Sequence, residues 1–497
     1  MITHGRKARK TMPVALLVEG RRCLVIGGGT VAGRKAGALL EAGAEVMLVA
    51  PEIGDYTEGL IGRLGLQIAR RKYAPIDLDG KPFVVIAATD DPGLNRSILE
   101  DCHARGVLCA CPDRGWEDGD FISPASFKHG DLTVSVSTGG ASCRRARLIK
   151  ESLSRHAEAL GQSDLLVVGT DHRLVNLAGR ESLHLSGAHL DETTAGLRQI
   201  LGLHEFMIVN TCNRMEVVGL GAITPALIAL VSRVLGLASL EARCSYAHCG
   251  KDAFRHVALV AAGLLSQTPR ETHIRAQIKD ALALSHHNGW SAGILHDWVG
   301  RALRIGNAIH RATGDILAAT EIEDRCLTYL TDILGDLRTR RVLVIGAGVV
   351  GRSLVQKLLD LGAAVTCCTR AQPPAFMRAG LDTVTWYPQT QMREALGEQD
   401  AVICATAGKD PILTAAHASW IAPNHSLVIV DLGVPRNVAP DFAAGRDSLR
   451  VANLDDLNQE LRSDTGALQQ ALIVGDRIIC EHIGEYDRVC DGIHTGD

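Results

Sequence analysis

The sequence predicts an α/β protein in which two parallel-sheet domains are separated by an α+β domain. One observation behind this prediction is a strand, glycine turn, helix and strand pattern that occurs twice, at residues 23–50 and 341–370. The other is the different character of the region between the copies. There, strand-like apolar runs from residue 164 to about 220 are followed by helical periodicity at 251–312.

Each copy of the repeated pattern looks like the opening βαβ unit of a Rossmann-like dinucleotide-binding domain. In such a unit one glycine permits the tight bend, a second leaves room for the pyrophosphate, and a third lets helix and strand pack closely. The helix N-terminus then faces the phosphates. The corresponding residues are Gly27, Gly29 and Ala32 in the first copy and Gly346, Gly348 and Gly351 in the second. We therefore predict nucleotide binding at both, the alternative being glycine turns that bind no nucleotide.

The end of the second strand in each copy indicates the nucleotide, because an acidic residue there accepts ribose hydroxyls and an arginine accepts a 2′-phosphate. The second copy ends in Thr369-Arg370, which predicts NADPH, unless Arg370 is simply an exposed loop residue. The first copy ends in Ala50-Pro51-Glu52, which does not discriminate, and NAD is the working assignment there.

Composition limits the classes of protein to consider. With 46% hydrophobic and 22% charged residues, the chain is neither disordered nor fibrous, and 497 residues are too many for one core. The net charge of -4 provides no overall attraction to nucleic acid, so an RNA partner would need a local basic face. Fourteen cysteines scattered through strand and helix patterns indicate reduced thiols, and we expect a cytoplasmic protein. No stretch reaches the 18 or more apolar residues of a membrane helix.

Further motifs follow the first glycine turn, and together they carry a resemblance. They are VVIAATDD at 84–91, Asn95, ACPD at 110–113, DFISPA at 120–125 and SVSTGGASC at 135–143. Over about residues 12–150 the series resembles the N-terminal module of siroheme synthase, the precorrin-2 dehydrogenase family. The resemblance implies NAD-dependent oxidation of precorrin-2 to sirohydrochlorin, with Asp113 as a catalytic group. It also implies that Gly27, Gly29, Thr30, Val31 and Asp90 bind the cofactor.

Two features qualify the expectation for this module. A carboxylate at the carboxyl end of a parallel strand lies where doubly wound sheets bind ligands, so Asp113 fits a role in proton removal. The alternative is a turn-forming aspartate before Arg114-Gly115. Family members with ferrochelatase activity continue into a further helical domain, whereas here only a basic helix at about 143–160 follows. We therefore do not expect iron insertion.

The string MIVNTCNRMEV at 207–217 places Cys212 after a strand-like run and beside Arg214. Only a thiolate attacks a carbonyl efficiently, and a nearby cation stabilises it. We therefore predict that Cys212 is a nucleophile and that the other cysteines are buried hydrophobic residues. Arg214 could instead simply pair with Glu216.

Residues 164–460 are similar to glutamyl-tRNA reductase. The motifs that carry this resemblance are GTDH at 169–172 with Arg180-Glu181, TCNRME at 211–216, RHVALVAAGL at 255–264, the second glycine turn, DLGVPRNV at 431–438 and LDDL at 454–457. The resemblance implies that Cys212 attacks the ester of glutamyl-tRNA(Glu), and that NADPH reduces the thioester to glutamate-1-semialdehyde. The residues implied for the glutamyl group are Thr211, Arg214, Ser266, Glu271 and Gln277. His256 is the titratable candidate near the nucleophile, although a hydrogen-bonded core histidine is an equal alternative.

The sequence departs from this family at several positions. The usual GLDS reads Gly263-Leu264-Leu265-Ser266, a glycine is replaced by Arg270, a glutamine by His273, and the Ala-Pro pair after His172 is absent. The C-terminal dimerisation domain is reduced to about 40 residues. We therefore expect any homodimer to form through the N-terminal module. We expect no metal site.

The predicted organisation has six parts: an NAD-binding domain at 12–113, a dimerisation segment with a linker helix at 114–162, a catalytic domain at 163–312, a linker helix at 313–338, an NADPH-binding domain at 339–457 and a truncated helical segment at 458–497. The leading hypothesis is a bifunctional enzyme whose substrates are glutamyl-tRNA and precorrin-2. One alternative keeps a single active half with the other as a scaffold. Another is a sensor built from two degenerate enzyme domains, against which the retained TCNR motif argues.

Overall fold

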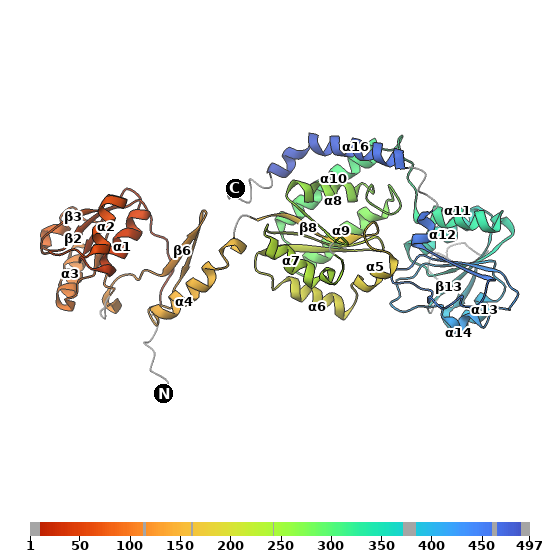
Figure 1. Cartoon of the computed structure of the whole chain (residues 1–497), viewed down its shortest axis with the longest axis horizontal. Coiled ribbons are helices and arrows are strands. Elements are labelled where there is room, and N and C mark those ends of the chain that lie inside the picture. Colours follow the sequence, from red (N-terminus) through yellow and green to blue (C-terminus); the bar gives the residue numbers. More distant parts are fainter. Residues whose placement is uncertain are drawn as a thin grey trace, which may run out of the picture. The chain divides into compact units, whose positions relative to one another are not determined.

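The computed structural model describes residues 10–112, 116–160, 163–241, 243–370, 384–459 and 465–488. These residues form two compact units, Met1–Ala157 and Glu158–Asp497, and each is described by itself (Figure 1). Asp113 lies outside the described residues. The described helices include none that is long and apolar enough to cross a membrane.

The first unit opens with a five-stranded parallel sheet of order β3-β2-β1-β4-β5. The strands are β1 (Arg22–Ile26), β2 (Glu45–Val49), β3 (Gln67–Ala69), β4 (Val84–Ala87) and β5 (Leu108–Ala110). The helices are α1 (Thr30–Glu41), α2 (Asp55–Leu64) and α3 (Pro92–Arg105). Alternate strand residues point to opposite faces, so Val25 packs with α1 and α2 while Leu24 packs with α3. Burial on both faces explains the continuous apolar runs in these strands.

The rest of the first unit is an antiparallel hairpin followed by a helix. Strands β6 (Ala125–His129) and β7 (Leu132–Val136) pair directly, and α4 (Cys143–Ser154) packs against them. Ser142 caps α4 by accepting a hydrogen bond from the backbone N–H of Arg145 at 3.2 Å.

The second unit begins with an antiparallel sheet of order β11-β8-β10-β9. Its strands are β8 (Ser163–Asp171), β9 (Leu203–Asn210), β10 (Arg214–Ala222) and β11 (Tyr246–Cys249). One face packs on α8 (Lys251–Ala261), α9 (His273–His287) and α10 (Gly293–Ala312). The other packs on α6 (Ala188–Leu197) and α7 (Pro225–Val234), while α5 (Leu177–Leu183) follows β8. All nine residues of β10 are buried because helices cover both faces.

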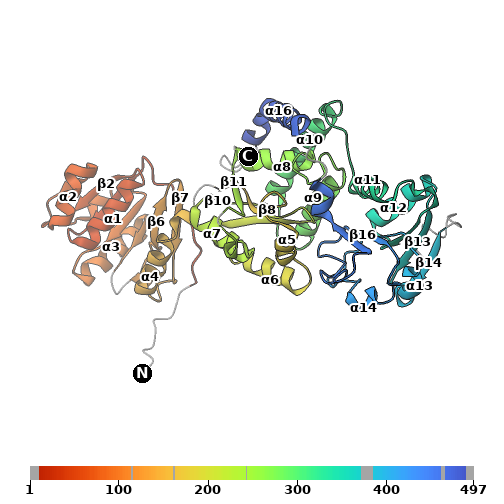
Figure 2. The ribbon, with the colours of Figure 1, turned by 45° about the vertical axis from the view of Figure 1, so that its right-hand side comes forward.

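The C-terminal helix α16 (Thr465–Glu481) packs on α8 and α10, as Figure 1 and Figure 2 both show. Ala471 and Ile479 of this helix join the core of the antiparallel-sheet domain. At Gly475 an added Cβ would stand 3.1 Å from Leu259 and 3.3 Å from Ile309, so the helix approaches its neighbours closely. Helix α16 is therefore part of this domain's core.

A six-stranded parallel sheet of order β14-β13-β12-β15-β16-β17 completes the second unit. The strands are β12 (Arg341–Ile345), β13 (Ala364–Thr369), β14 (Thr385–Pro388), β15 (Ala401–Cys404), β16 (Leu427–Asp431) and β17 (Leu449–Asn453). The linker helix α11 (Ile322–Leu334), α12 (Val349–Asp360) and α15 (Leu454–Gln459) share one face, and α13 (Met392–Leu396) and α14 (Ala415–Ala418) the other. The predicted fold class is confirmed.

Candidate functional site

The two glycine turns have matching geometry. Gly27 and Gly346 adopt φ values of 121° and 114°, in the left-handed half of conformational space that favours glycine. A Cβ at these residues would stand 2.3 Å from the Ala88 carbonyl oxygen and 2.4 Å from that of Ala405. The two turns therefore require glycine for both conformation and space.

The second glycine of each turn borders open space. A Cβ at Gly29 or Gly348 would meet nothing within 4 Å, and each residue is the N-cap of its helix without a side-chain cap. The first backbone N–H groups of α1 and α12 are thus left for an anion such as a pyrophosphate. Thr30 and Val31 are exposed at the start of α1, and Asp90 is exposed beyond β4.

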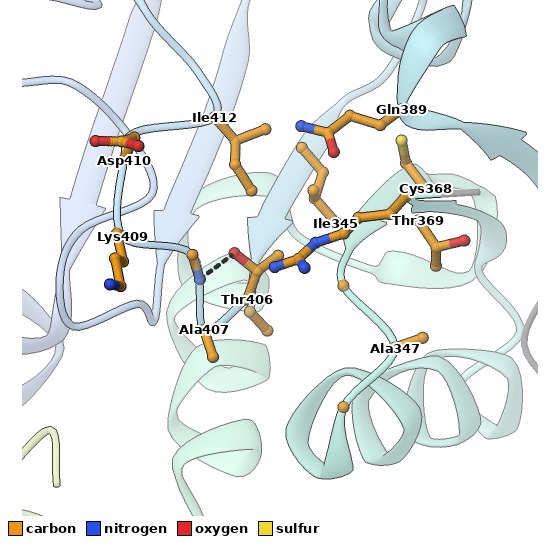
Figure 3. Close-up of a pocket in the computed structure, with 15 residues that line it drawn as sticks. Ile345, Ala347, Cys368, Thr369, Gln389, Thr406, Ala407, Lys409, Asp410 and Ile412 are labelled. Atoms are coloured by element: carbon orange, nitrogen blue, oxygen red, sulfur yellow. Dashed lines mark hydrogen bonds between the residues drawn. The ribbon is translucent and has the colours of Figure 1, made fainter. Parts of the chain in front are cut away.

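A cavity of about 470 Å³ lies at the carboxyl ends of the strands in the C-terminal parallel sheet. Figure 3 shows the turn that carries Ala347 on one side and the loop with Thr406, Ala407 and Lys409 on the other. Arg370 contributes to the same lining. Gly346 and Gly348, predicted to bind a nucleotide, are therefore brought together with Arg370 at one cavity. Lys409 was not predicted, because nothing in its local sequence marks it.

Asn437 and Asp431 fix the loop with Thr406, which lines one side of this cavity. Asn437 is fully buried, and its Oδ1 accepts hydrogen bonds from Thr406 N (2.9 Å) and Thr406 Oγ1 (3.1 Å). The Asp431 carboxylate accepts from the backbone N–H groups of Gly433, Asn437 and Val438 at 2.8–2.9 Å. Burial nevertheless raises the pKa of Asp431 to about 6. The DLGVPRNV motif therefore supports the loop that lines the cavity.

Cys212 lies at the tip of the hairpin between β9 and β10. The loop spans residues 211–213, and the Thr211 hydroxyl accepts hydrogen bonds from the backbone N–H groups of Asn213 and Arg214, both at 3.2 Å. The Cys212 carbonyl accepts a hydrogen bond from Arg180 Nε at 3.0 Å. The structure therefore assigns Thr211 to bracing the turn, and it fixes the backbone of the predicted nucleophile from two sides.

The hydrogen bonds of the Arg214 guanidinium are with a carboxylate and a backbone carbonyl. Its Nη1 lies 2.8 Å from Glu216 Oε1, and its Nη2 donates to the Leu265 carbonyl at 2.5 Å. Both charged side chains are at most 2% exposed. Burial opposes ionisation of Glu216, but Arg214 and His256 outweigh it and hold the pKa of its carboxyl well below the usual value. The alternative interpretation, that Arg214 pairs with Glu216, describes the observed contact.

His256 belongs to the same buried network. Its Nε2 lies 2.8 Å from Glu216 Oε1, and its ring stacks on His248 with centroids 4.8 Å apart. Tyr246 donates to the same carboxylate. His256 is 4% exposed, as in the alternative of a hydrogen-bonded core histidine. Its recorded contacts are with the network around Glu216 and not with Cys212.

The thiol of Cys212 is protonated in the free protein. Burial raises its pKa to about 12, and the Glu271 carboxylate adds to the increase, whereas Arg180 and Arg214 oppose it. Arg214 therefore favours the thiolate as expected, but burial outweighs its effect, and the guanidinium is already paired with Glu216.

Alkylation of Cys212 should be slow and should accelerate with pH. Against an ordinary thiol pKa of about 8.5, a pKa of about 12 lowers the thiolate fraction at pH 8 roughly 10³-fold. The rate constant should rise about tenfold per pH unit from pH 7 to 10, since only the thiolate reacts. Mass spectrometry of iodoacetamide-treated protein measures this rate, with exposed Cys143 and Cys480 as internal references. Rapid labelling of Cys212 at pH 7 would contradict the protonated state.

Two buried polar atoms close to this hairpin have no hydrogen-bond partner among the described residues, His172 Nδ1 and Arg214 Nε, while the Ser266 hydroxyl is buried beside Glu271. His172 adjoins the loop, since its backbone N–H donates to the Asn213 carbonyl at 2.9 Å. Burial lowers the pKa of His172 to about 4, so its ring is neutral. Unsatisfied buried polar groups are costly and are characteristic of sites that a polar ligand completes. His172 stands in the GTDH motif but was not predicted as a site residue.

Two residues predicted to bind the glutamyl group remain, and only one of them, Glu271, lies near the Cys212 loop. Glu271 is 8% exposed and faces the Cys212 loop, with its Oε1 3.4 Å from Asn213 Nδ2. Burial and Glu321 raise the pKa of Glu271 to about 7. Gln277 is exposed on α9, one turn beyond His273, with no recorded contact to this group. Thr211, Arg214, Ser266 and Glu271 are therefore brought together, and Gln277 is apart from them.

Arg270 precedes Glu271 in a left-handed conformation, with φ 62°. Its guanidinium donates to the His310 carbonyl at 2.8 Å and also to the Leu317 carbonyl. These two bonds to buried carbonyls offset the cost of left-handed backbone in a residue with a side chain. They give a physical reason why an arginine can stand at this turn.

Two ion pairs connect the Cys212 domain with the C-terminal parallel-sheet domain. Arg180, which holds the Cys212 carbonyl, also bonds Asp455 Oδ1 through Nη2 at 2.9 Å. Glu181 forms a bidentate pair with Arg436, at 2.8 Å from Nε to Oε1 and 2.6 Å from Nη2 to Oε2. Motifs 275 and 255 residues apart are thus direct partners. Arg180 links the nucleophile's loop to the domain with the nucleotide cavity.

Fold and site together define a pyridine-nucleotide-dependent oxidoreductase. Family models match most of the chain: glutamyl-tRNAGlu reductase, N-terminal domain, at 168–313; shikimate / quinate 5-dehydrogenase at 329–460; putative NAD(P)-binding at 14–125; and sirohaem biosynthesis protein central at 129–156. The chain belongs to the glutamyl-tRNA reductase family, to which an N-terminal region of the siroheme type is fused.

Curated relatives support this assignment. The glutamyl-tRNA reductase of Gloeothece citriformis is 31% identical over 316 residues, which cover 60% of this chain and 73% of that one. The enzyme of Rippkaea orientalis is 28% identical over 339 residues, 65% and 78% of the two chains. A solved structure named SirC, precorrin-2 dehydrogenase, is 25% identical, covers 38% of this chain and 82% of its own, and has a TM-score of 0.26. The resemblances predicted from the motifs are confirmed.

Proposed function

We propose that the second unit is an NADPH-dependent glutamyl-tRNA reductase that works through a thioester on Cys212, in tetrapyrrole biosynthesis. The observation that carries this proposal is that the loop holding Cys212 adjoins two residues with buried polar atoms that lack a direct partner among the described residues, Arg214 Nε and His172 Nδ1. An aminoacyl group offers carboxylate, ammonium and carbonyl groups that can satisfy such atoms. We assign glutamyl-tRNA as the substrate because the matched relatives are glutamyl-tRNA reductases.

The proposed reaction has two chemical steps. The Cys212 sulfur loses its proton and adds to the ester carbonyl of glutamyl-tRNA, and the ribose oxygen of the tRNA leaves with a proton. NADPH supplies the hydride that converts the resulting thioester to glutamate-1-semialdehyde and frees the thiol. Burial raises the pKa of the free thiol to about 12, so the thiol must give up its proton during the first step. Arg180 positions the Cys212 loop by holding its carbonyl.

The test of this function is NADPH-dependent formation of glutamate-1-semialdehyde from charged glutamyl-tRNA by the full chain. Product formation that requires both the tRNA ester and NADPH supports the proposal. Free glutamate should give no product, because it lacks the ester that the thiol attacks. A folded protein that makes no product from fully charged tRNA would overturn the proposal.

Arg370 is the residue that we propose selects NADPH over NADH, because it lines the nucleotide cavity at the end of β13. Loss of a charge-assisted hydrogen bond costs about 1.5–3 kcal/mol, so Arg370→Ser should lower the NADPH-to-NADH ratio of kcat/KM roughly 10- to 100-fold. Steady-state kinetics with each nucleotide measures the ratio. Arg477→Ser, which removes an exposed arginine from α16, should leave the ratio unchanged. An unchanged ratio in Arg370→Ser would remove this residue from the assignment.

For the first unit we propose NAD-dependent oxidation of precorrin-2 to sirohydrochlorin, with Asp113 as the catalytic group. The glycine turn at Gly27 and Gly29 and the two family matches over residues 14–156 support this assignment. Asp113→Ala should abolish the oxidation while leaving glutamate-1-semialdehyde formation intact. Oxidation at the wild-type rate in Asp113→Ala, or none in the wild type, would favour the alternative in which this half is a scaffold or sensor.

A further inference from the structure

A histidine and two glutamates meet where the antiparallel-sheet domain joins the linker helix. His273 is the first residue of α9, Glu321 is the N-cap of α11, and Glu323 stands in the first turn of α11. One ligand atom from each residue lies within 4.8 Å of the others. None of the three was predicted as a site residue, and His273 is 48 positions from Glu321 and 50 from Glu323.

Distances within this cluster suit a bound cation better than direct hydrogen bonds. His273 Nε2 lies 3.6 Å from Glu321 Oε2 and 3.7 Å from Glu323 Oε1. Hydrogen bonds between such groups span about 2.7–3.2 Å. Ligand atoms bound at about 2.1 Å in a tetrahedral arrangement stand about 3.4 Å apart, close to the observed values.

The two carboxylates also have few close partners for their burial. The Glu323 side chain is 0% exposed and makes no short hydrogen bond among the described residues; His273, at 3.7 Å, the Ser353 side chain and its own backbone N–H are the groups that favour its charge. Glu321 Oε2 likewise makes no short hydrogen bond among the described residues, whereas Glu321 Oε1 accepts from Thr272 N at 3.1 Å and Thr272 Oγ1 at 2.7 Å. A fully buried carboxylate requires a compensating positive charge. Glu321 Oε2 and Glu323 Oε1 both lie close to His273 Nε2. A cation that compensates the two carboxylates would therefore lie between the three side chains.

We propose that His273, Glu321 and Glu323 bind one divalent transition-metal ion of the Zn²⁺ type. One imidazole and two carboxylates form a donor set suited to first-row ions, and three protein ligands leave a position for water. The ion fastens the start of α9 to the start of α11, the helix that leads into the C-terminal parallel-sheet domain. Gln277, one turn along α9 from His273, lies on the same side of the helix. This proposal departs from the expectation of no metal site.

The test uses the full chain, stripped of metal by a chelator and titrated with Co²⁺ and Zn²⁺ in the absence of substrate. Co²⁺ should give d–d absorption that saturates at one ion per chain, and Zn²⁺ should displace it. His273→Gln and Glu323→Gln should each weaken Zn²⁺ binding at least tenfold in competition with a chromophoric chelator. His287→Gln and Asp332→Asn, exposed substitutions on the same two helices, should bind as the wild type does.

Zn²⁺ should also raise the melting temperature of the wild type and not that of Glu323→Gln, since an ion that binds only the folded state stabilises it. Circular dichroism of each variant in chelator shows whether it is folded. Failure of the wild type to bind, or binding unchanged in both ligand variants, overturns the proposal and leaves a protonated His273 as the partner of the two carboxylates. Because no substrate is used, this outcome is independent of the reductase proposal.

Discussion

Cys212→Ser is expected to lower glutamate-1-semialdehyde formation by at least about 10³-fold, the range typical of a lost covalent nucleophile. Serine preserves the size of the side chain and the 211–213 turn, but its hydroxyl is a far weaker nucleophile than a thiolate. Nucleotide binding should remain, because the cavity is built by residues 345–370 and 389–412. The measurement is product formation from glutamyl-tRNA at saturating NADPH.

Cys249→Ser is the matched control for this substitution. Cys249 is a half-buried cysteine of the same domain, in β11, and should tolerate serine with nearly full activity. Equal losses in both variants would indicate damage to the domain. A Cys212→Ser protein with wild-type activity would show that the reaction needs no thiol.

Arg214→Met is expected to destabilise the antiparallel-sheet domain by about 3–5 kcal/mol, because it leaves Glu216 charged and buried without its main partner. Hydrogen exchange of the β8–β10 amides in denaturant measures the free energy of opening in this domain. The second substitution Glu216→Gln should recover a large part of the loss, since it removes the unpaired charge. No recovery in the double variant would assign the loss to packing and not to charge.

The local features of this chain could be predicted from its sequence. Each glycine turn lies within one short segment, in which a strand, the turn and a helix follow one another. The pattern therefore predicts a nucleotide site at Gly346 and Gly348, where the cavity lies. The TCNR motif is equally local, so the position of Cys212 directly after a strand could be predicted as well. The order of α and β elements was sufficient for the fold class.

Features that depend on distant contacts could not be predicted. Glu216 meets His256 across 40 positions, and Arg180 meets Asp455 across 275. Nothing in the motif around Arg214 shows whether its guanidinium faces the thiol or the carboxylate of Glu216, because both lie two residues away. Burial decides between them, since a fully enclosed carboxylate needs the cation more than a thiol that can stay protonated. The pairing of Arg180 and Glu181 with the LDDL and DLGVPRNV motifs depends on how the domains pack, which the sequence does not show.

The central claim is that the reaction passes through a thioester on Cys212, and trapping that intermediate tests it most directly. The full chain is mixed with tRNA carrying radiolabelled glutamate, without NADPH, and then denatured. We expect about one label per active site, located on Cys212, released by hydroxylamine, absent from Cys212→Ser and converted to glutamate-1-semialdehyde when NADPH is added before denaturation. A wild-type protein that makes the semialdehyde yet carries no label, or carries it on another residue, would contradict the account.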